Sequence, residues 1–309
     1  MPRIPRMVVT DPGQKVAYHV ISRTALDGLP FKQVEKDELV RIIQRYSAVY
    51  AVDVVGYAIM GSHFHLLVVV TPGEMVSDEE VVRRYHLLYG EGTGFPEAQL
   101  GEFRKRFTSL SAYIKDIKQT FSIFYNKRKK RKGTLWGERF KSVIVQEGNA
   151  LINCLAYIDL NAVRAGIVKR PEAYRWCSIG YRMQTGNREG FLSSELGIPE
   201  FGGADPAAQL QSYREFLYHM GAIEKRGKAK ISQRILDKET STGFKLPQAA
   251  RLMCRSRYFT DSGIIGSRAF VETTYGLFKG RYQTRREKIP EAVEGIEGLF
   301  SLKRLAGTS

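Results

Sequence analysis

Residues 52–71, VDVVGYAIMGSHFHLLVVVT, decide the fold of this chain. Two runs rich in β-branched residues, 52–60 and 63–71, are joined by a Gly-Ser dipeptide, which is typical of a tight turn. The pattern predicts two antiparallel strands. Because side chains alternate across a strand, His63 and His65 point to the same face of the second strand, with their imidazoles close together.

This histidine pair has two interpretations. Neutral imidazole is the commonest protein ligand for a divalent metal, so His63 and His65 can be two ligands of a metal site that needs a third. They can equally be two polar residues on the solvated face of a half-buried strand. The pair alone does not decide between these interpretations.

The sequence around the hairpin indicates an α+β layer fold. Further elements are predicted as a strand at 15–23, a helix at 36–50, helices at 77–90 and 100–130, a strand at 140–146 and a helix at 149–164. This order of strands and helices predicts a sheet with its helices mainly on one face.

Beyond these elements the composition changes. Residues 186–205 are rich in Gly and polar residues, which is typical of a linker or an extended arm. A helix at 206–221 and a pattern of helix, turn and helix at 246–285 follow. We therefore expect a main domain at 1–185 and a small, basic, mainly helical C-terminal unit at 206–309, whose role the sequence does not define.

The net charge indicates the class of partner. The 309 residues include 48 Lys and Arg against 32 Asp and Glu, which leaves a net charge of +16. Solubility alone rarely needs so large an imbalance. With 16 Tyr and 16 Phe in addition, we expect a polyanionic partner, and nucleic acid first.

Nothing in the sequence indicates export or a membrane partner. No apolar run approaches the ~20 residues that span a bilayer, and the N-terminus lacks the pattern of a signal peptide. Cys154, Cys177 and Cys254 are far apart and fit neither a disulfide framework nor a zinc site. We expect a cytoplasmic protein.

The helix predicted at 149–164 adds a second pair of functional residues. Tyr157 and Asn161 are four residues apart and so lie on one face of the helix. Alone, they can be a packed ring beside a helix-terminal amide. With the histidine pair they suggest a site for Mg²⁺ or Mn²⁺, which prefer oxygen and accept imidazole. Asn161 could then supply a carbonyl oxygen as the third ligand, one helical turn from Tyr157.

Three motifs carry a resemblance to a known family. HFH at 63–65, GTLWGERFKS at 133–142 and AYIDLNAVRAGIV at 156–168 resemble, in this order, the REP-associated tyrosine transposases. These belong to the HUH single-tyrosine transposases and nucleases. The resemblance covers roughly residues 10–185. The chain departs from compact relatives by extra helical sequence around 77–110.

The resemblance implies a fold, a site and a reaction. The implied fold is a ferredoxin-like antiparallel sheet with the histidine pair on a central strand. His63 and His65 are implied as metal ligands, Tyr157 as the nucleophile and Asn161 as the residue that completes the metal site. The implied substrate is single-stranded or hairpin DNA of the repetitive extragenic palindrome type, cleaved through a 5′-phosphotyrosine and rejoined without ATP. Nucleoid association would follow, and a monomer and a homodimer both stay open.

Basic and aromatic residues near these motifs are candidate DNA contacts. They are Lys127, Arg128, Lys129, Lys130, Arg131, Lys132, Trp136, Arg139, Lys141 and Arg164. Each has an alternative interpretation. The 127–132 run can be merely solvated, Trp136 can be a core residue, and Arg164 can be a partner of the helix C-terminus.

Other residues of the same chemical types are less favoured. Tyr113 and Tyr125 are rival nucleophiles, but neither is followed by Asn or Gln four residues later. His19, His86 and His219 are isolated in the sequence and are expected to be structural.

Two further functions remain as alternatives to the nuclease. A domesticated, non-catalytic DNA-hairpin-binding protein would have the same charge and fold, and would bind DNA equally well without Tyr157. A metallohydrolase that activates water would leave no covalent adduct and would tolerate Tyr157→Phe. It is the less favoured of the two, because no carboxylate is positioned as an obvious base.

Overall fold

A four-stranded antiparallel sheet forms the centre of the computed structural model, which describes residues 13–193, 205–245, 262–278, 289–292 and 300–303. Its strands are β1 (Val16–Arg23), β2 (Val52–Ile59), β3 (His63–Val70) and β4 (Lys141–Val145). The strand order is β2-β3-β1-β4, so the β3 strand that begins with the histidine pair lies between β2 and β1.

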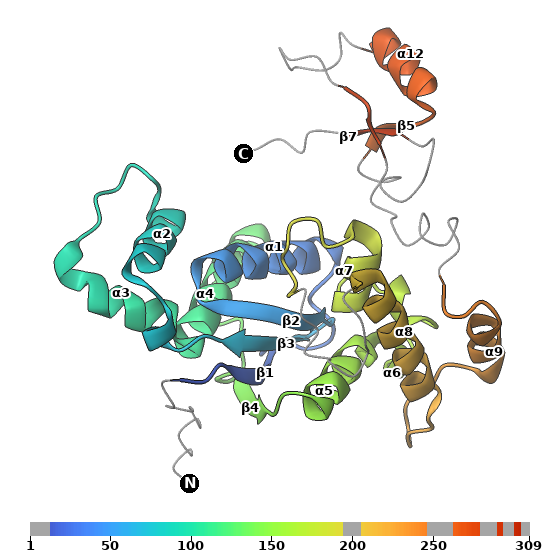
Figure 1. The fold of residues 1–309 in the computed structure, drawn as a ribbon, viewed down its shortest axis with the longest axis horizontal. Helices are drawn as coiled ribbons and strands as arrows, with labels where there is room; N and C mark the ends of the chain where they lie inside the picture. Colours follow the sequence, from blue (N-terminus) through green and yellow to red (C-terminus); the bar gives the residue numbers. More distant parts are fainter. Residues whose placement is uncertain (1–12, 194–204, 246–261, 279–288, 293–299, 304–309) are drawn as a thin grey trace.

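Two helices connect these strands and cover one face of the sheet (Figure 1). Helix α1 (Gln33–Val49) follows β1, and helix α4 (Leu110–Arg128) lies between β3 and β4. The element order with this strand order is ferredoxin-like, which confirms the α+β fold class and the central position of the histidine strand.

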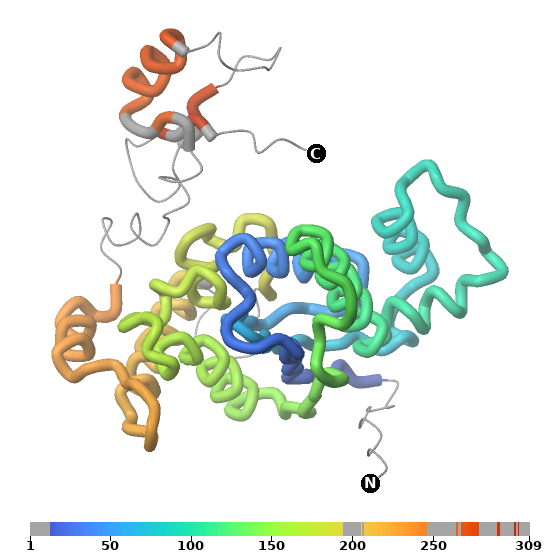
Figure 2. The backbone as a smooth tube through the Cα atoms, turned by 180° about the vertical axis from the view of Figure 1, so that it is seen from behind, coloured from blue at the N-terminus to red at the C-terminus, as the bar shows by residue number. Residues whose placement is uncertain are grey.

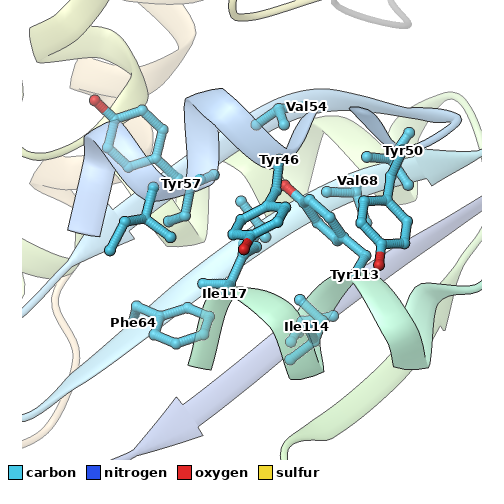
Figure 3. Close-up of a cluster of buried hydrophobic side chains, with 14 of the residues drawn as sticks. Tyr46, Tyr50, Val54, Tyr57, Phe64, Val68, Tyr113, Ile114 and Ile117 are labelled. Carbon is cyan, nitrogen blue, oxygen red and sulfur yellow. The ribbon is translucent and has the colours of Figure 1, made fainter. Parts of the chain in front are cut away.

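The core between the sheet and these helices is rich in aromatic residues (Figure 3). Tyr46 of α1 and Tyr113 of α4 lie beside Val54 and Val68 of the sheet in this view. Two of its hydroxyls have hydrogen-bond partners, since Tyr46 bonds Thr120 at 2.8 Å and Tyr113 bonds Ser47 at 2.9 Å. This layer makes the sheet a rigid support for side chains on its other face.

Helix α5 (Asn149–Asp159) packs on that other face, so helices contact both faces of the sheet. Gly56 of β2 makes this approach possible. A Cβ added there would lie 2.1 Å from Cδ1 of Leu155 and 2.9 Å from Oγ of Ser178. The register of β2 against β3 shifts between Val54 and Gly56, next to this close contact.

The sequence around 77–110 forms two helices, of which the first confirms the helix expected at 77–90. Helices α2 (Asp78–Tyr89) and α3 (Leu100–Phe107) project beyond one end of the sheet, as Figures 1 and 2 both show. The single helix expected at 100–130 is broken because Ser109 caps α4, accepting the N–H of Ala112 at 3.2 Å.

Four helices follow α5 and contribute to its hydrophobic cluster. Helices α6 (Asn161–Arg164), α7 (Ser178–Thr185), α8 (Pro206–Ala222) and α9 (Gln233–Ser241) follow in order. Short 3₁₀ turns lie at Gly73–Met75, Glu97–Gln99 and Pro171–Ala173. Buried residues of α8 and α9 share one hydrophobic cluster with α5, and the buried Arg214 of α8 pairs with Glu172 and Glu239. The boundary expected at 186–205 stays a prediction.

The last described segments contain a small sheet besides the expected helix. Strands β5 (Ser262–Gly266), β6 (Glu291–Ala292) and β7 (Phe300–Lys303) pair in the order β5-β7-β6, and α12 (Arg268–Phe278) follows β5. The pattern of helix, turn and helix expected at 246–285 is therefore wrong at 262–266, where a strand forms, and residues 246–261 and 279–285 lie outside the described residues. In the described part of the chain, every helix is too short or too polar to cross a membrane.

Candidate active site

The pairing of β1 with β3 brings a third histidine to the predicted pair. Ile21 lies opposite His65 and Arg23 opposite His63, so His19 is on the same sheet face, one pleat along from His65. The Nε2 atom of His19 is 3.0 Å from Nδ1 of His65, and the two rings are stacked with centroids 5.2 Å apart.

Tyr157 of α5 lies over this cluster. Its ring is edge-on to the ring of His65, with centroids 5.7 Å apart, and to the ring of His19 at 5.9 Å. The side chain is 51% exposed, in contrast to the buried face of α5 that packs on the sheet. The structure thus brings the predicted nucleophile to the predicted ligand His65 and leaves it accessible to solvent.

Asn161 lies one turn further on, at the start of α6. Its Nδ2 donates to the carbonyl oxygens of Tyr157 at 3.0 Å and Ile158 at 3.3 Å. Among the described residues, no hydrogen bond engages its Oδ1. Because the amide nitrogen is committed to the helix, the oxygen is the atom that is left to bind a cation.

Burial holds the three imidazoles neutral. It lowers the pKa of His19 to about 4 and, with the Arg23 guanidinium nearby, that of His63 to about 4. The pKa of His65 is lowered to about 3 by burial and then by His63, His19 and Arg23. Neutral imidazoles at pH 7 have the lone pairs that metal binding requires.

The hydrogen bonds of the predicted ligands leave the same atom available on both. Nδ1 of His65 is engaged by His19, and Nδ1 of His63 is 3.3 Å from Oγ of Ser62, which accepts a bond from Arg23 at 3.1 Å. In each ring Nε2 is therefore the nitrogen without a described partner, as expected of metal-ligating histidines.

The predicted ligands differ from the four Cys or His ligands of a structural zinc site. Within the described residues, no group of three His, Cys, Asp or Glu could hold a metal. Two imidazole nitrogens with the amide oxygen of Asn161 would form an incomplete set, which would leave open positions for water and substrate oxygens. Such a set suits Mg²⁺ or Mn²⁺ bound together with a phosphate.

The rival tyrosines are both in the core. Tyr113 is fully buried and bonded to Ser47 at 2.9 Å, and burial raises the pKa of its hydroxyl well above the ordinary value. Tyr125 is 5% exposed and packs against Phe31. A phosphate cannot reach the Tyr113 hydroxyl without opening the core, and the packed Tyr125 is far less exposed than Tyr157.

The basic run at 127–132 is divided between structural and exposed cations. Arg128 and Lys129 both pair with the buried Glu35 of α1, at 3.3 and 2.9 Å. Arg131 donates to Asn126 and to the Thr134 carbonyl. In the described part of the chain, no ion pair or hydrogen bond engages the side chains of three exposed lysines: Lys127, Lys130 and Lys132.

Trp136 and Arg164 have structural partners. The Trp136 indole packs on Phe31, Phe64 and Phe121 and donates to the Lys118 carbonyl at 3.0 Å, which favours its interpretation as a core residue. Arg164 donates to the carbonyls of Met220, Ile223 and Ala229, and so holds the C-terminal end of α8 and the loop after it.

Arg139 and Lys141 remain exposed beside the sheet. Lys141 lies opposite Ile21, which in turn lies opposite His65, so these three residues form one row on the face of the histidines. Among the predicted DNA contacts, Lys141 therefore lies in the same cross-strand row as His65. The DNA contacts themselves stay predictions.

His19 and Arg23 are members of the site that were not predicted from the sequence. His19 was expected to be structural, yet it contacts both His65 and Tyr157. The available signal was the alternation in VAYHVISR, which places His19 and Arg23 on one face of a strand next to the histidine strand.

No family model matches this chain, and neither does any curated protein. Two transposases are among the solved structures that are similar to it. One is a REP-associated tyrosine transposase bound to a REP hairpin, with 14% identity, a TM-score of 0.41, and coverage of 60% of this chain and 87% of that chain. The other is a candidate transposase from Deinococcus radiodurans R1, with 16% identity, a TM-score of 0.27, and coverage of 47% and 88%. The first is of the family that the motifs resemble. Both likenesses are remote, so what the site can do is judged from this chain's own residues.

Proposed function

We propose that this chain is a metal-dependent single-stranded DNA endonuclease and strand transferase, with Tyr157 as its nucleophile. One observation supports this above all. Tyr157 is 51% exposed and its ring lies edge-on to His65, whose neutral imidazole has Nε2 available. A reachable hydroxyl beside a cation site is the arrangement that phosphoryl transfer to tyrosine needs.

The cleavage step follows from these groups. The Tyr157 hydroxyl oxygen attacks the scissile phosphorus, and the new Oη–P bond forms as the bond from phosphorus to the 3′ oxygen breaks. The hydroxyl loses a proton and the leaving 3′ oxygen gains one, so the products are a 5′-phosphotyrosine and a free 3′-OH. Because one phosphoester replaces another, a second 3′-OH can reverse the step on a new strand without ATP.

The other residues of the site have supporting roles in this proposal. His63 and His65 would hold Mg²⁺ or Mn²⁺ through Nε2, and Asn161 through Oδ1. The bound ion would polarise the scissile phosphate and offset the charge that develops on its oxygens. Arg139 and Lys141 would bind neighbouring phosphates. The hairpin form of the substrate is what the motif resemblance implies.

A covalent-adduct assay tests the proposal. The protein is incubated with Mg²⁺ and hairpin DNAs from around its own gene, labelled at the 3′ end because the 3′ fragment keeps the phosphotyrosine. We expect a labelled band near protein mass on a denaturing gel, absent with EDTA, with Tyr157→Phe and with His63→Ala. The matched control is Tyr125→Phe. Tyr125 is 5% exposed and packs in the core, so the adduct should persist in this variant.

Two results would contradict the proposal. Cleavage without an adduct, retained in Tyr157→Phe, would mean that activated water is the nucleophile. Tight hairpin binding with no cleavage of any flanking hairpin, unchanged by Tyr157→Phe, would identify a DNA-hairpin-binding protein that does not turn its ligand over.

A further inference from the structure

His19 has contacts that a purely structural histidine does not need. Its side chain is only 7% exposed, its Nε2 is 3.0 Å from Nδ1 of His65, and its ring lies edge-on to Tyr157. It is therefore a buried polar group in contact with both a proposed metal ligand and the proposed nucleophile.

The chemistry of imidazole makes the direction of this hydrogen bond important. A neutral imidazole has one N–H and one nitrogen lone pair. If Nδ1 of His65 donates to His19, the lone pair of His65 is on Nε2 and faces away from His19. If His19 donates instead, Nε2 of His65 has the hydrogen and cannot bind a cation. One hydrogen bond thus decides whether His65 is a competent ligand.

We propose that His19 is a positioning residue, which accepts the Nδ1–H of His65 and so fixes the tautomer and ring orientation that present Nε2 to Mg²⁺ or Mn²⁺. This inference rests on the proposed function, since it requires a cation at His65. Partners of this kind orient a metal-ligating histidine and raise its basicity. The stacking of the two rings, at 5.2 Å between centroids, further restrains rotation of His65.

The two ligands differ in how firmly their orientation is held. The partner of His63 is the Ser62 hydroxyl at 3.3 Å, a neighbour in sequence, whereas His65 is held by a residue from another strand at 3.0 Å. Loss of His19 should therefore affect His65 and leave the contact of His63 intact.

Calorimetric titration with MnCl₂ in the absence of DNA tests this role without relying on activity. His19→Phe keeps an aromatic ring but removes the acceptor, and we expect roughly 10- to 100-fold weaker Mn²⁺ binding, the usual cost of losing such a partner. His19→Gln can place its amide oxygen near the lost Nε2, so it should restore part of the affinity. His86→Phe, on α2, is the matched control and should bind as the wild type does.

A second measurement needs no substitution that could impair folding. In ¹⁵N-labelled protein saturated with Mg²⁺, long-range ¹H–¹⁵N spectra report the tautomer of each of the five histidines. We expect the Nδ1–H tautomer for His65. The Nε2–H tautomer at His65, or wild-type Mn²⁺ affinity in His19→Phe, would overturn the proposed role of His19.

The outcomes separate this inference from the proposed function. If His63→Ala abolishes Mn²⁺ binding while His19→Phe retains it, the metal site stands and only the role of His19 falls. If the wild-type protein binds no Mn²⁺, both the metal site and the role of His19 are overturned.

Discussion

The Tyr213 hydroxyl on α8 donates a hydrogen bond of 2.8 Å to Asp159 on α5, two residues from Tyr157. The other oxygen of Asp159 accepts from the Ser178 hydroxyl at 2.7 Å and the Ile179 N–H at 3.0 Å. Burial raises the pKa of the Asp159 carboxyl, and these bonds oppose the rise. Residues two positions apart on a helix point in nearly opposite directions. Asp159 therefore bonds α5 to α7 and α8 on the side of the helix that faces away from Tyr157.

Removal of the hydrogen bond between Tyr213 and Asp159 should destabilise the fold. We expect Tyr213→Phe to lower the free energy of unfolding by roughly 1–3 kcal/mol, because it leaves an oxygen of a buried carboxylate without its donor. Urea denaturation measures the change. Tyr89→Phe, whose ring is 44% exposed, is the control and should change stability by less than about 0.5 kcal/mol. Equal stability of Tyr213→Phe and wild type would show that the bond contributes nothing.

The parts of the fold that sequence could predict are those fixed by local patterns. Alternation in 52–71 specifies both strands and the shared face of His63 and His65, and the structure has the strands at Val52–Ile59 and His63–Val70. The helical period places Tyr157 and Asn161 one turn apart. The break at Ser109 was missed because a serine inside a helical pattern can also be an exposed helix residue.

The relationships that sequence could not predict are long-range. His19 meets His65 only because β1 and β3 pair with Ile21 opposite His65, and no local pattern fixes that register. Likewise, Lys129 and its buried partner Glu35 are far apart in the chain. The residues of a cationic run therefore look alike in the sequence, although only some of them form ion pairs within the fold.

Gly56 sets how closely α5 approaches the sheet. In Gly56→Ala the new Cβ would lie 2.1 Å from Leu155 Cδ1 and 2.9 Å from Ser178 Oγ, so the helix or its side chains must shift. We expect a loss of about 1–3 kcal/mol in the free energy of unfolding, as for other overpacked sites. We also expect a lower adduct yield, because the same helix positions Tyr157. Gly92→Ala, where nothing lies within 4 Å of the added Cβ, is the matched control. Wild-type stability and activity in Gly56→Ala would show that the neighbouring side chains make room for the added Cβ without loss of stability.

The basic run should separate into residues that bind DNA and residues that hold the fold. The double variant Lys130→Ala with Lys132→Ala removes exposed cations, and we expect the slope of log affinity against log salt to become shallower by about 1–2, with stability unchanged.

Lys129→Ala should instead lower the free energy of unfolding by about 1–2 kcal/mol, since it takes one of two cations from the buried Glu35. Binding titrations over a range of salt and urea denaturation measure the two quantities. The same salt slope in the double variant and the wild type would exclude these two lysines from the DNA interface.

The imidazoles of the site should make the stability of the metal-free protein fall with pH. In the unfolded chain a histidine takes up its proton near pH ~6.5, whereas in the fold the pKa is lowered to about 4 for His19 and His63 and to about 3 for His65. Between about pH 6.5 and 4 the unfolded state therefore binds more protons, so stability present at pH 7 is lost as the pH falls through this window.

Urea midpoints in EDTA at pH 7 and at about pH 4.5 measure this loss of stability. His65→Gln removes one of the three groups and should reduce it, whereas Tyr157→Phe keeps all three and should not. An equal loss of stability in His65→Gln and the wild type would mean that the pKa of His65 is the same in the folded and the unfolded state.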